Sequence, residues 1–431
     1  MVYPLTFGFA SMTFRVLLPP LALFLALLPA CAESADESGG LASGGGANSG
    51  SAGASGKNSA AEAGVGADKG APSDGSNSNS SAGASAASNM IGTTAPATWN
   101  SAKAVTISEA QLQAEYTAWK AAHVEACTNG SSIVVNDGQV VSEGIGYGML
   151  LSAAMADQTL FDGLWKFYQD HLDKNGLMNW KTKKCEAPGN NNENAATDAD
   201  LDVTMALVQA ASRWPNSSAG YLAKAEVLAG KILQFETEMC AGRRILRPGD
   251  VWGGCSDFGN PRINPSYFSP AYYKVFAHYF SSQASTWLSL SDASYQLFAI
   301  YQSRLNNLVP DSSAPDGSDN GIGNQYWYDA CRTPWRVAVD YAWTGDSRAK
   351  TFMQNISSWV DAHGGLPKAA QQQNSAFVGA FALAGGYDQA KFDTYMSGWL
   401  GATTLDDAPY FQGTLRVLYL LAAAGKFSST L

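Results

Sequence analysis

SEGIGYGMLLSAAMA, residues 142–156, begins where a loop becomes a helix and places one carboxylate, Glu143, among three glycines. The apolar run that follows predicts a helix over residues 143–156. The glycines let the backbone and a ligand approach closely, because no side chains intervene. Two interpretations of Glu143 follow: an acid that stabilises the helix dipole, or an acid that does chemistry at the helix start.

Helical spacing continues on both sides of this stretch. From Ser108 onward, where Ser108-Glu109-Ala110-Gln111 reads as a capping box, apolar residues recur at helical intervals. Tight links alternate with long Gly/Asn/Pro-rich loops, which predicts an all-α fold of six helical hairpins. The twelve helices are predicted near residues 108–126, 143–156, 160–172, 199–214, 219–238, 269–285, 291–309, 329–344, 346–363, 374–385, 387–400 and 410–425.

Three long loops carry a large share of the aromatic and acidic residues. They cover residues 177–200, 246–270 and 310–336. In an array of hairpins such loops lie together at one end. Long loops inside a compact domain are more often functional than incidental, so we expect the site at that end.

The first 97 residues differ in composition from the rest. An apolar segment that ends at Cys31 predicts an export signal over residues 1–31, either a secretory signal or a lipoprotein signal that anchors the protein to a membrane through a lipid on Cys31. Residues 32–97 are rich in Gly, Ser and Ala and predict a disordered linker. The catalytic domain is then residues 98–431, secreted or at the outer cell surface.

Export implies an oxidising compartment in which cysteines pair. We predict the bridges Cys127–Cys185 and Cys240–Cys255 and leave Cys331 as a thiol. The chain has no CxxC or HExxH motif and only four histidines, so we expect neither a metal site nor a cofactor. The net charge of −10 argues against nucleic acid and favours a neutral polymer as partner of a monomeric protein.

The segment ATDADLD, residues 196–202, enters another predicted helix. On that helix Asp198 and Asp202 share a face and Asp200 points elsewhere, so at most two of the three acids serve one site. The DxDxD spacing also occurs in calcium loops, but this chain lacks the glycine and the bidentate glutamate that such a loop needs. Helix capping is the simple alternative for Asp198.

The segment YWYDACRTPWR, residues 326–336, places Asp329 at a third predicted helix start. An i,i+3 ion pair with Arg332 is its simple interpretation. Together, Glu143, Asp198 and Asp329 put carboxylates at three helix starts that face the same end. Hydrolysis of a glycosidic bond needs two acids in different environments, one protonated to donate to the leaving oxygen and one ionised to activate water or attack carbon.

Aromatic side chains accompany these acids in the long loops. Trp180, Trp252, Tyr267 and Trp335 would stack on the apolar faces of sugar rings. Core packing is the alternative for each of them, because tryptophan is usually largely buried. Tyr328, next to Asp329, and Arg332 complete the expected substrate-binding residues.

From about Trp99 to the C-terminus the sequence resembles glycoside hydrolase family 8. The resemblance is carried by SEGIGYGM, by ATDADLDVTMALVQAASRW, by NPSYFSPAYY and by YDACRTPWR. The chain departs from the family signature at Val203 and Thr204, where Ile or Met followed by Ala is usual. This change lies on the helix body and leaves Asp198 in place.

The resemblance implies an (α/α)6 barrel and an inverting, endo-acting hydrolase. By position, Glu143 would be the general acid, Asp329 the general base that activates water, and Asp198 the residue that binds and distorts the central sugar. Arg332 would support the base. Inversion needs the acid and the base roughly 6.5 to 9.5 Å apart so that a water fits between them.

The resemblance also implies that Trp180 and Trp252 are sugar platforms, and it makes β-1,4-glucan, as cellulose or mixed-linkage glucan, the expected substrate. Xylan and chitosan are the alternatives within the family, and a role in cellulose synthesis is the alternative to polysaccharide degradation. A non-catalytic polysaccharide-binding protein would keep the aromatic residues without needing the three acids. A lyase would need an acidic polymer and a Tyr, His or Arg base.

Overall fold

The computed structural model describes residues 99–430, apart from 105, 188–193 and 405–407. The predicted export signal over residues 1–31 and the predicted linker over residues 32–97 lie outside this part of the chain. Within the described ranges, none of the helices combines the length and the apolar character that a membrane span requires.

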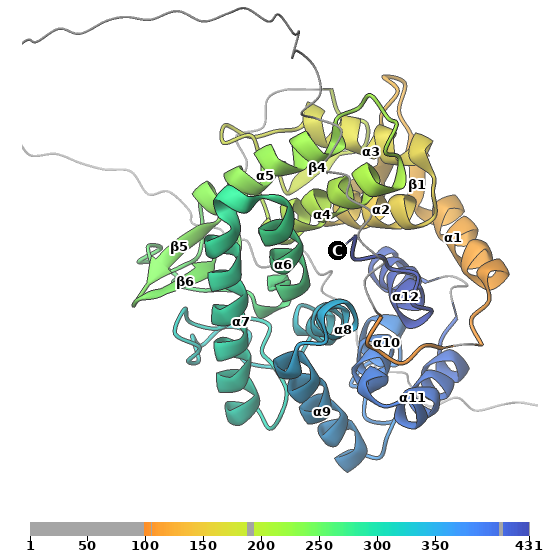
Figure 1. The fold of residues 1–431 in the computed structure, drawn as a ribbon, viewed down its shortest axis with the longest axis vertical. Helices are drawn as coiled ribbons and strands as arrows, with labels where there is room; N and C mark the ends of the chain where they lie inside the picture. The colour runs from red at the N-terminus through yellow and green to blue at the C-terminus, as the bar shows by residue number, and fades with distance from the viewer. Residues whose placement is uncertain (1–98, 105, 188–193, 405–407, 431) are drawn as a thin grey trace, which may run out of the picture. The chain divides into compact units, whose positions relative to one another are not determined.

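The described residues form an (α/α)6 barrel, as predicted. Figure 1 shows an inner ring of even-numbered helices surrounded by an outer ring of odd-numbered helices. The inner helices are α2 (Ser142–Ala154), α4 (Thr197–Arg213), α6 (Pro270–Tyr279), α8 (Thr333–Thr344), α10 (Ser375–Ala384) and α12 (Tyr410–Ala423). The outer helices are α1 (Glu109–His123), α3 (Gln158–Asp170), α5 (Tyr221–Phe235), α7 (Ala284–Arg304), α9 (Ser347–Ala362) and α11 (Gln389–Ala402).

The two rings differ in burial because they differ in sequence pattern. Every residue of α10, SAFVGAFALA, is buried, and α2 and α4 are buried over most of their length. A helix that is apolar on all sides is stable only when it is surrounded by other elements. The outer helix α9 instead buries one stripe, which includes Phe352 and Ile356, and leaves its other face to solvent.

The connections place the long loops at one end of the barrel. Short links follow the inner helices, for example residues 155–157 after α2 and residues 345–346 after α8. Longer segments, such as residues 171–196 and 305–332, lead from an outer helix to the start of the next inner helix. The starts of the inner helices therefore share the end that carries the long loops, as the sequence predicts.

All twelve predicted helices are present, and the largest difference is at α7. The prediction was residues 291–309, whereas α7 covers Ala284–Arg304. Ser291, the first residue of the predicted helix, is buried inside α7. The real start has no side-chain cap, so no local signal marks it. By contrast, Ser108 accepts a hydrogen bond from the Gln111 N–H and caps α1 as predicted.

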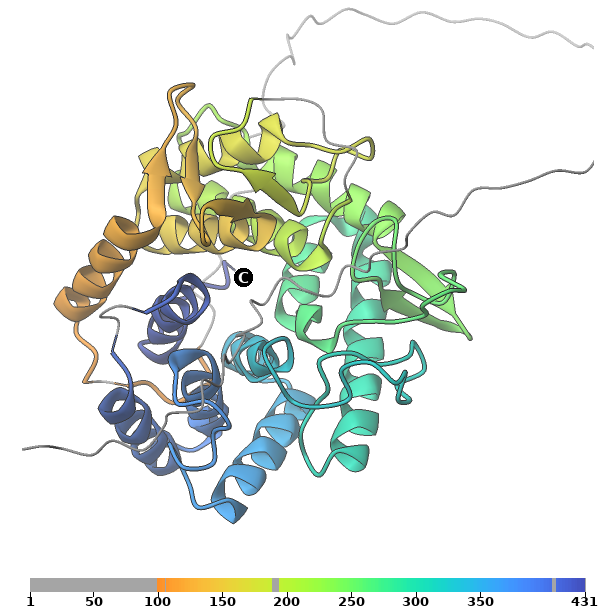
Figure 2. The ribbon, with the colours of Figure 1, turned by 180° about the vertical axis from the view of Figure 1, so that it is seen from behind.

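Among the described residues, three short antiparallel strand pairs accompany the helices of the barrel. Strand β1 (Val124–Ala126) pairs with β2 (Ser132–Val134), β3 (Gln139–Val141) with β4 (Lys181–Lys183), and β5 (Thr237–Cys240) with β6 (Arg243–Leu246). In the two opposite views the β5–β6 hairpin and the loop after α7 lie on the same side of the ring (Figure 2). A bridge between Ile263 and Ser313 joins the loop after β6 to the loop after α7.

Both predicted disulfides are present. Cys127 and Cys185 are joined, and so are Cys240 and Cys255. Cys331 takes part in neither bridge and is buried. Each bridge fastens a segment of the loop-bearing end, which limits the conformations open to those loops.

Candidate active site

Glu143 lies in the first turn of α2, held by a strand pair next to it. Val141 pairs with Lys181 across β3 and β4, and the Ser142 N–H donates to the carbonyl of Trp180 at 2.8 Å. The side chain of Glu143 accepts hydrogen bonds from Arg332 and Tyr410, which belong to other elements. Stabilisation of the helix start is therefore an incomplete account of this acid.

The glycines around Glu143 make room for protein atoms, including the backbone of Ala199, as predicted, whereas the approach of a ligand stays a prediction. A Cβ at Gly146 would lie 2.9 Å from the Cβ of Asp202, so this glycine allows α2 and α4 to pack closely. A Cβ at Gly144 would lie 3.0 Å from the hydroxyl oxygen of Tyr410. That hydroxyl donates to Oε1 of Glu143 at 2.9 Å.

Asp198 lies in the first turn of α4 and is almost completely buried. Its Oδ1 accepts from the Ala199 N–H at 2.9 Å, and the neighbouring Thr197 N–H donates to the carbonyl of Pro248 at 3.2 Å. Asp200 turns away and accepts from the hydroxyl of Tyr168. The expectation that the acids of this segment cannot all serve one site is confirmed.

Asp329 precedes a short 3-10 turn, Ala330–Arg332, that leads into α8. Its Oδ1 accepts from Nη2 of Arg332 at 2.6 Å, so the predicted i,i+3 ion pair is present. The pair is only part of the arrangement, because Nη1 of the same guanidinium donates to Glu143 Oε2 and, at 3.0 Å, to Asp198 Oδ2. One arginine thus gathers the three acids that the sequence places at three separate helix starts.

The guanidinium of Arg332 has a further partner. Its Nη2 donates to the hydroxyl of Ser266 at 2.9 Å, and that hydroxyl donates to Oδ1 of Asn264. The Arg332 guanidinium carbon lies 5.4 Å from the centre of the Tyr267 ring. The NPSY segment therefore orients the arginine from a third side, and a planar guanidinium suits such multiple contacts.

The three carboxylates differ in exposure. The side chain of Asp198 is 4% exposed, that of Glu143 is 17% exposed and that of Asp329 is 38% exposed, whereas Arg332 is 3% exposed. The cluster therefore has a closed side at α4 and an open side at Asp329. Of the three carboxylates, that of Asp329 is the most accessible to solvent.

Burial changes the proton affinity of the two inner acids. It raises the pKa of Glu143, and the charge of Asp329 adds to this rise while Arg332 and Tyr410 oppose it. Burial also raises the pKa of Asp198 to about 7, again against Arg332. Three carboxylates share one guanidinium here, so retention of a proton avoids an uncompensated buried charge.

A second arginine pairs with an aspartate behind this cluster. Arg336 donates from Nη1 and Nη2 to the two carboxylate oxygens of Asp202, and both side chains are buried. Sequence reasoning missed this pair, although Arg336 follows Arg332 by four residues, as Asp202 follows Asp198. The matching spacing on two helices is a signal that could have found it.

Four of the five predicted aromatic residues are partly exposed: Trp180, Trp252, Tyr267 and Tyr328. Their role in sugar binding stays a prediction. Trp335 is a correction, because its side chain is fully buried and packs edge-on against Tyr147 with ring centres 6.2 Å apart. It belongs to the core and has no face for a sugar.

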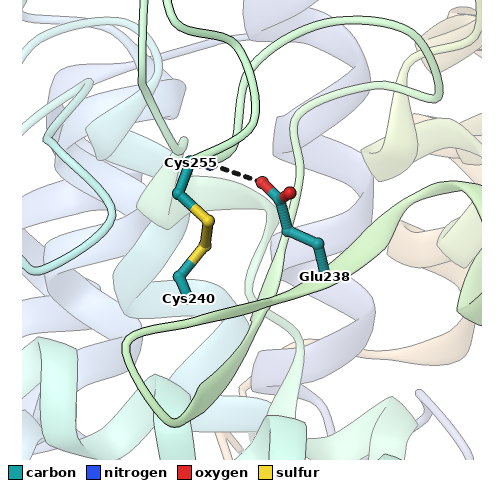
Figure 3. Close-up of side chains that lie close together, drawn as sticks. All are labelled: Glu238, Cys240 and Cys255. Atoms are coloured by element: carbon teal, nitrogen blue, oxygen red, sulfur yellow. Dashed lines mark hydrogen bonds between the residues drawn. A yellow bond between two sulfur atoms is a disulfide. The ribbon is translucent and has the colours of Figure 1, made fainter.

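A disulfide and a hydrogen bond restrain the loop that carries Trp252. Figure 3 shows the Cys240–Cys255 disulfide beside Glu238, whose carboxylate accepts from the Cys255 N–H. The two sulfurs are bonded to each other, so this cluster offers no thiolates to a metal ion. The Arg262 guanidinium carbon lies 4.7 Å from the centre of the Trp252 ring and covers one of its faces.

Comparison with known proteins agrees with this geometry. The profile of glycosyl hydrolases family 8 matches residues 88–425. The chain belongs to this family. It is 34% identical to "Endoglucanase 2" of Ruminiclostridium josui over 339 residues, which cover 73% of this chain and 71% of that protein. It is 33% identical to "Endoglucanase A" of Acetivibrio thermocellus over 350 residues, 75% of this chain and 70% of that protein.

Solved structures share the fold of this family 8 member. The beta-1,3-1,4-glucanase of Paenibacillus sp. X4 superposes with a TM-score of 0.67 at 24% identity, covering 77% of this chain and 96% of that one. A xylanase of Teredinibacter turnerae superposes with a TM-score of 0.61 at 18% identity, covering 75% and 95%. The protein is a glycoside hydrolase with an (α/α)6 barrel, and polysaccharide is its class of substrate.

Proposed function

We propose that the protein is an inverting, endo-acting hydrolase of β-1,4-glucan, with Glu143 as general acid and Asp329 as general base. The observation that carries the proposal is the convergence of these two carboxylates, with Asp198, on the single guanidinium of Arg332. The acid and the base contact different nitrogens of that group. An inverting mechanism requires that a water and a sugar carbon fit between the acid and the base.

The proposed acid step needs a protonated Glu143. Burial and the charge of Asp329 raise the pKa of Glu143, which favours the protonated form to higher pH than for an ordinary glutamate. Tyr410 is a suitable neighbour because a phenol hydroxyl can donate to the carboxylate and accept from the carboxylic acid. Glu143 then donates its proton to the glycosidic oxygen as the bond to the anomeric carbon breaks.

The proposed base step uses the open side of the cluster. Asp329 keeps its Oδ1 on Arg332, and its exposed carboxylate can take a proton from a water. That water attacks the anomeric carbon from the face opposite the leaving oxygen, which inverts the configuration. Asp198, at the closed side, is proposed to hold the central sugar in a distorted ring shape.

The substrate proposal is supported by the names of the relatives. Relatives that are 32 to 34% identical are called endoglucanases, which favours β-1,4-glucan. Xylan is the second candidate, because the solved structures of this fold include a xylanase and exo-oligoxylanases. Release of reducing sugar from carboxymethylcellulose, lichenan, xylan and chitosan, measured side by side, separates these substrates.

The catalytic assignment is tested by Glu143→Gln and Asp329→Asn. We expect kcat to fall by about 10² to 10⁴ for each variant, with little change in substrate binding. Glu109→Gln is the matched control, since Glu109 forms an exposed ion pair with Lys426. A non-catalytic binder would bind polysaccharide equally well in all variants and release no sugar in any. Proton NMR of the first product should show the α-anomer, and a β-anomer would contradict inversion.

We further propose that the protein is exported as a monomer, either secreted or held at the outer cell surface by a lipid on Cys31. The two disulfides support export because such bonds persist in oxidising compartments. Mass spectrometry of the mature N-terminus would distinguish the two routes. A lipid on Cys31 predicts recovery in the membrane fraction.

A further inference from the structure

We infer that Asp311 is a positioning residue for the proposed base, Asp329. The inference rests on the proposed role of Asp329. Asp311 lies near the start of the long loop between α7 and α8, 18 residues before Asp329 in the sequence. One oxygen of its carboxylate, Oδ1, accepts hydrogen bonds from two backbone N–H groups, that of Trp327 at 3.0 Å and that of Ala330 at 2.7 Å.

These two bonds lie on both sides of the base in the chain. Trp327 is two residues before Asp329 and Ala330 is the residue after it. A third bond, from the Asp311 N–H to the carbonyl of Gln325 at 2.8 Å, ties the same segment to the same residue. Asp311 therefore restrains the backbone of this turn on both sides of Asp329.

The residue expected to cap the helical turn Ala330–Arg332 is Asp329 itself. An aspartate that precedes a helical turn commonly caps it by accepting one of the N–H groups left without helical partners. Asp329 makes no side-chain capping bond. The N–H groups that such a cap would bind have backbone partners instead, since the Cys331 N–H donates to the carbonyl of Trp327 and the Arg332 N–H to that of Asp329. Asp311 accepts the Ala330 N–H, and the carboxylate of Asp329 is left for Arg332 and for solvent.

The surroundings of Asp311 agree with this division of roles. The residue is partly buried, and burial together with the charge of Asp329 raises its pKa to about 7. The two carboxyl groups are thus close enough to influence each other. An oxygen that accepts two backbone N–H groups serves equally well on a carboxylic acid or on an amide.

The rival explanation is that Asp311 only closes its own loop. The Ser312 N–H also donates to the carbonyl of Gly323 at 3.1 Å, so a second hydrogen bond closes this loop without involving the turn that carries Asp329. A purely structural residue would change the melting temperature and leave kcat of the folded enzyme unaltered. A positioning residue changes kcat while KM stays the same.

Asp311→Ala, Asp311→Asn and Asp311→Glu separate these possibilities. The alanine variant removes the accepting oxygen, and we expect kcat to fall by about 10²-fold at an unchanged KM, as for a small displacement of a catalytic group. The asparagine variant keeps an oxygen in place and should stay within a few-fold of the original kcat. The glutamate variant keeps the charge but moves the oxygen, and we expect a loss of about tenfold. Asp316→Ala is the control, because Asp316 caps an exposed turn of the same loop.

The outcomes are distinct. A kcat of Asp311→Ala equal to that of Asp316→Ala overturns the inference. If the alanine variant does not fold, the other two decide: an active asparagine variant with an impaired glutamate variant supports positioning, and the reverse order overturns it. Asp329→Ala, assayed alongside, tests the foundation. If Asp329→Ala retains its turnover, the proposed role of Asp329 as base is wrong. If Asp329→Ala is inactive and Asp311→Ala is fully active, Asp329 remains the proposed base and only the positioning role of Asp311 is wrong.

Combining Asp311→Ala with Asp329→Ala gives a double-mutant cycle. If Asp311 acts through the base, its removal has no further effect on the residual rate once Asp329 is absent. A full additional loss of about 10²-fold in the Asp329→Ala background would contradict action through Asp329.

Discussion

Two arginines one helical turn apart, Arg332 and Arg336, contact two aspartates one turn apart on α4, Asp198 and Asp202. The two regions share their chemistry and their geometry. They differ in their neighbours: Arg336 has Asp202 as its acidic partner among the described residues, whereas Arg332 also contacts Glu143 and Asp329.

This difference distinguishes the structural pair at Arg336 from the proposed reactive cluster at Arg332. The Arg336–Asp202 pair is balanced in charge and closed to solvent. The Arg332 cluster has three acids for one cation and opens to solvent at Asp329. A surplus of buried acid holds a proton, and an open carboxylate can take one. In the proposed mechanism, the general acid and the general base depend on this charge imbalance at the exposed end of the cluster, whereas the neighbouring balanced pair only holds two helices together.

The largest effect should come from breaking the closed pair. Asp202→Ala leaves the Arg336 cation buried without a counter-charge, and we expect a loss of about 3–5 kcal/mol in the free energy of unfolding. Chemical denaturation measures this loss. Asp292→Ala is the control, because its ion pair with Arg348 is exposed and should contribute about 1 kcal/mol or less. Equal stabilities of the two variants would show that the closed pair is not structural.

A matched pair of substitutions sharpens the comparison. In Arg332→Lys a single ammonium cannot reproduce the fork that binds three carboxylates and Ser266, so we expect kcat to fall by at least about 10²-fold. In Arg336→Lys the loss should appear in stability, by about 1.5–3 kcal/mol, with kcat of the folded enzyme little changed. Kinetics and thermal unfolding of both variants test this, and an exchange of the two phenotypes would reverse our assignment.

The sequence predicts more of the fold than of the site. Apolar periodicity and turn residues are local, so all twelve helices could be found. The prediction for α7 was displaced at a start that has no side-chain cap. The three acids could also be predicted to converge, because each lies at the start of an inner helix and those starts share one end. The disulfides followed from the same placement of loops.

Other parts of the site depend on contacts with no local signal. Tyr410 lies 267 residues from Glu143, and nothing in its own segment marks it as a partner of an acid. Trp335 could not be distinguished from a sugar platform, since tryptophan suits both a core and a carbohydrate. Its burial is decided by Tyr419 and Phe427, which come from distant parts of the chain.

The pH dependence of stability distinguishes the regions further. Burial raises the pKa of Asp198 to about 7 from an ordinary value of 3.8, so the folded state holds more protons than the unfolded state between these values. The free energy of unfolding therefore falls as the pH rises from about 4 to about 7. Asp200 and Asp311, with pKa values of about 7, act in the same direction.

Asp198→Asn should make this pH dependence shallower, because the amide does not titrate. Melting temperatures measured between pH 4 and pH 8 check the slope. Asp316→Asn provides a contrast: hydrogen bonds from Ser318 lower the pKa of Asp316, so its removal should act in the opposite direction and weakly, at an exposed site. An unchanged slope in Asp198→Asn would mean that Asp198 does not retain a proton in the folded state.

The smallest effect should come from Tyr410→Phe, which removes one hydrogen bond from the reactive cluster and nothing from the closed pair. The Tyr410 hydroxyl lowers the pKa of Glu143, so its loss should raise that pKa further. A general acid with a higher pKa stays protonated to higher pH, so the alkaline limb of kcat/KM should move to higher pH. Tyr326→Phe is the control, since its buried hydroxyl makes no hydrogen bond in the described structure. If the alkaline limb of kcat/KM stays in place or moves to lower pH in Tyr410→Phe, that limb does not report the ionisation of Glu143.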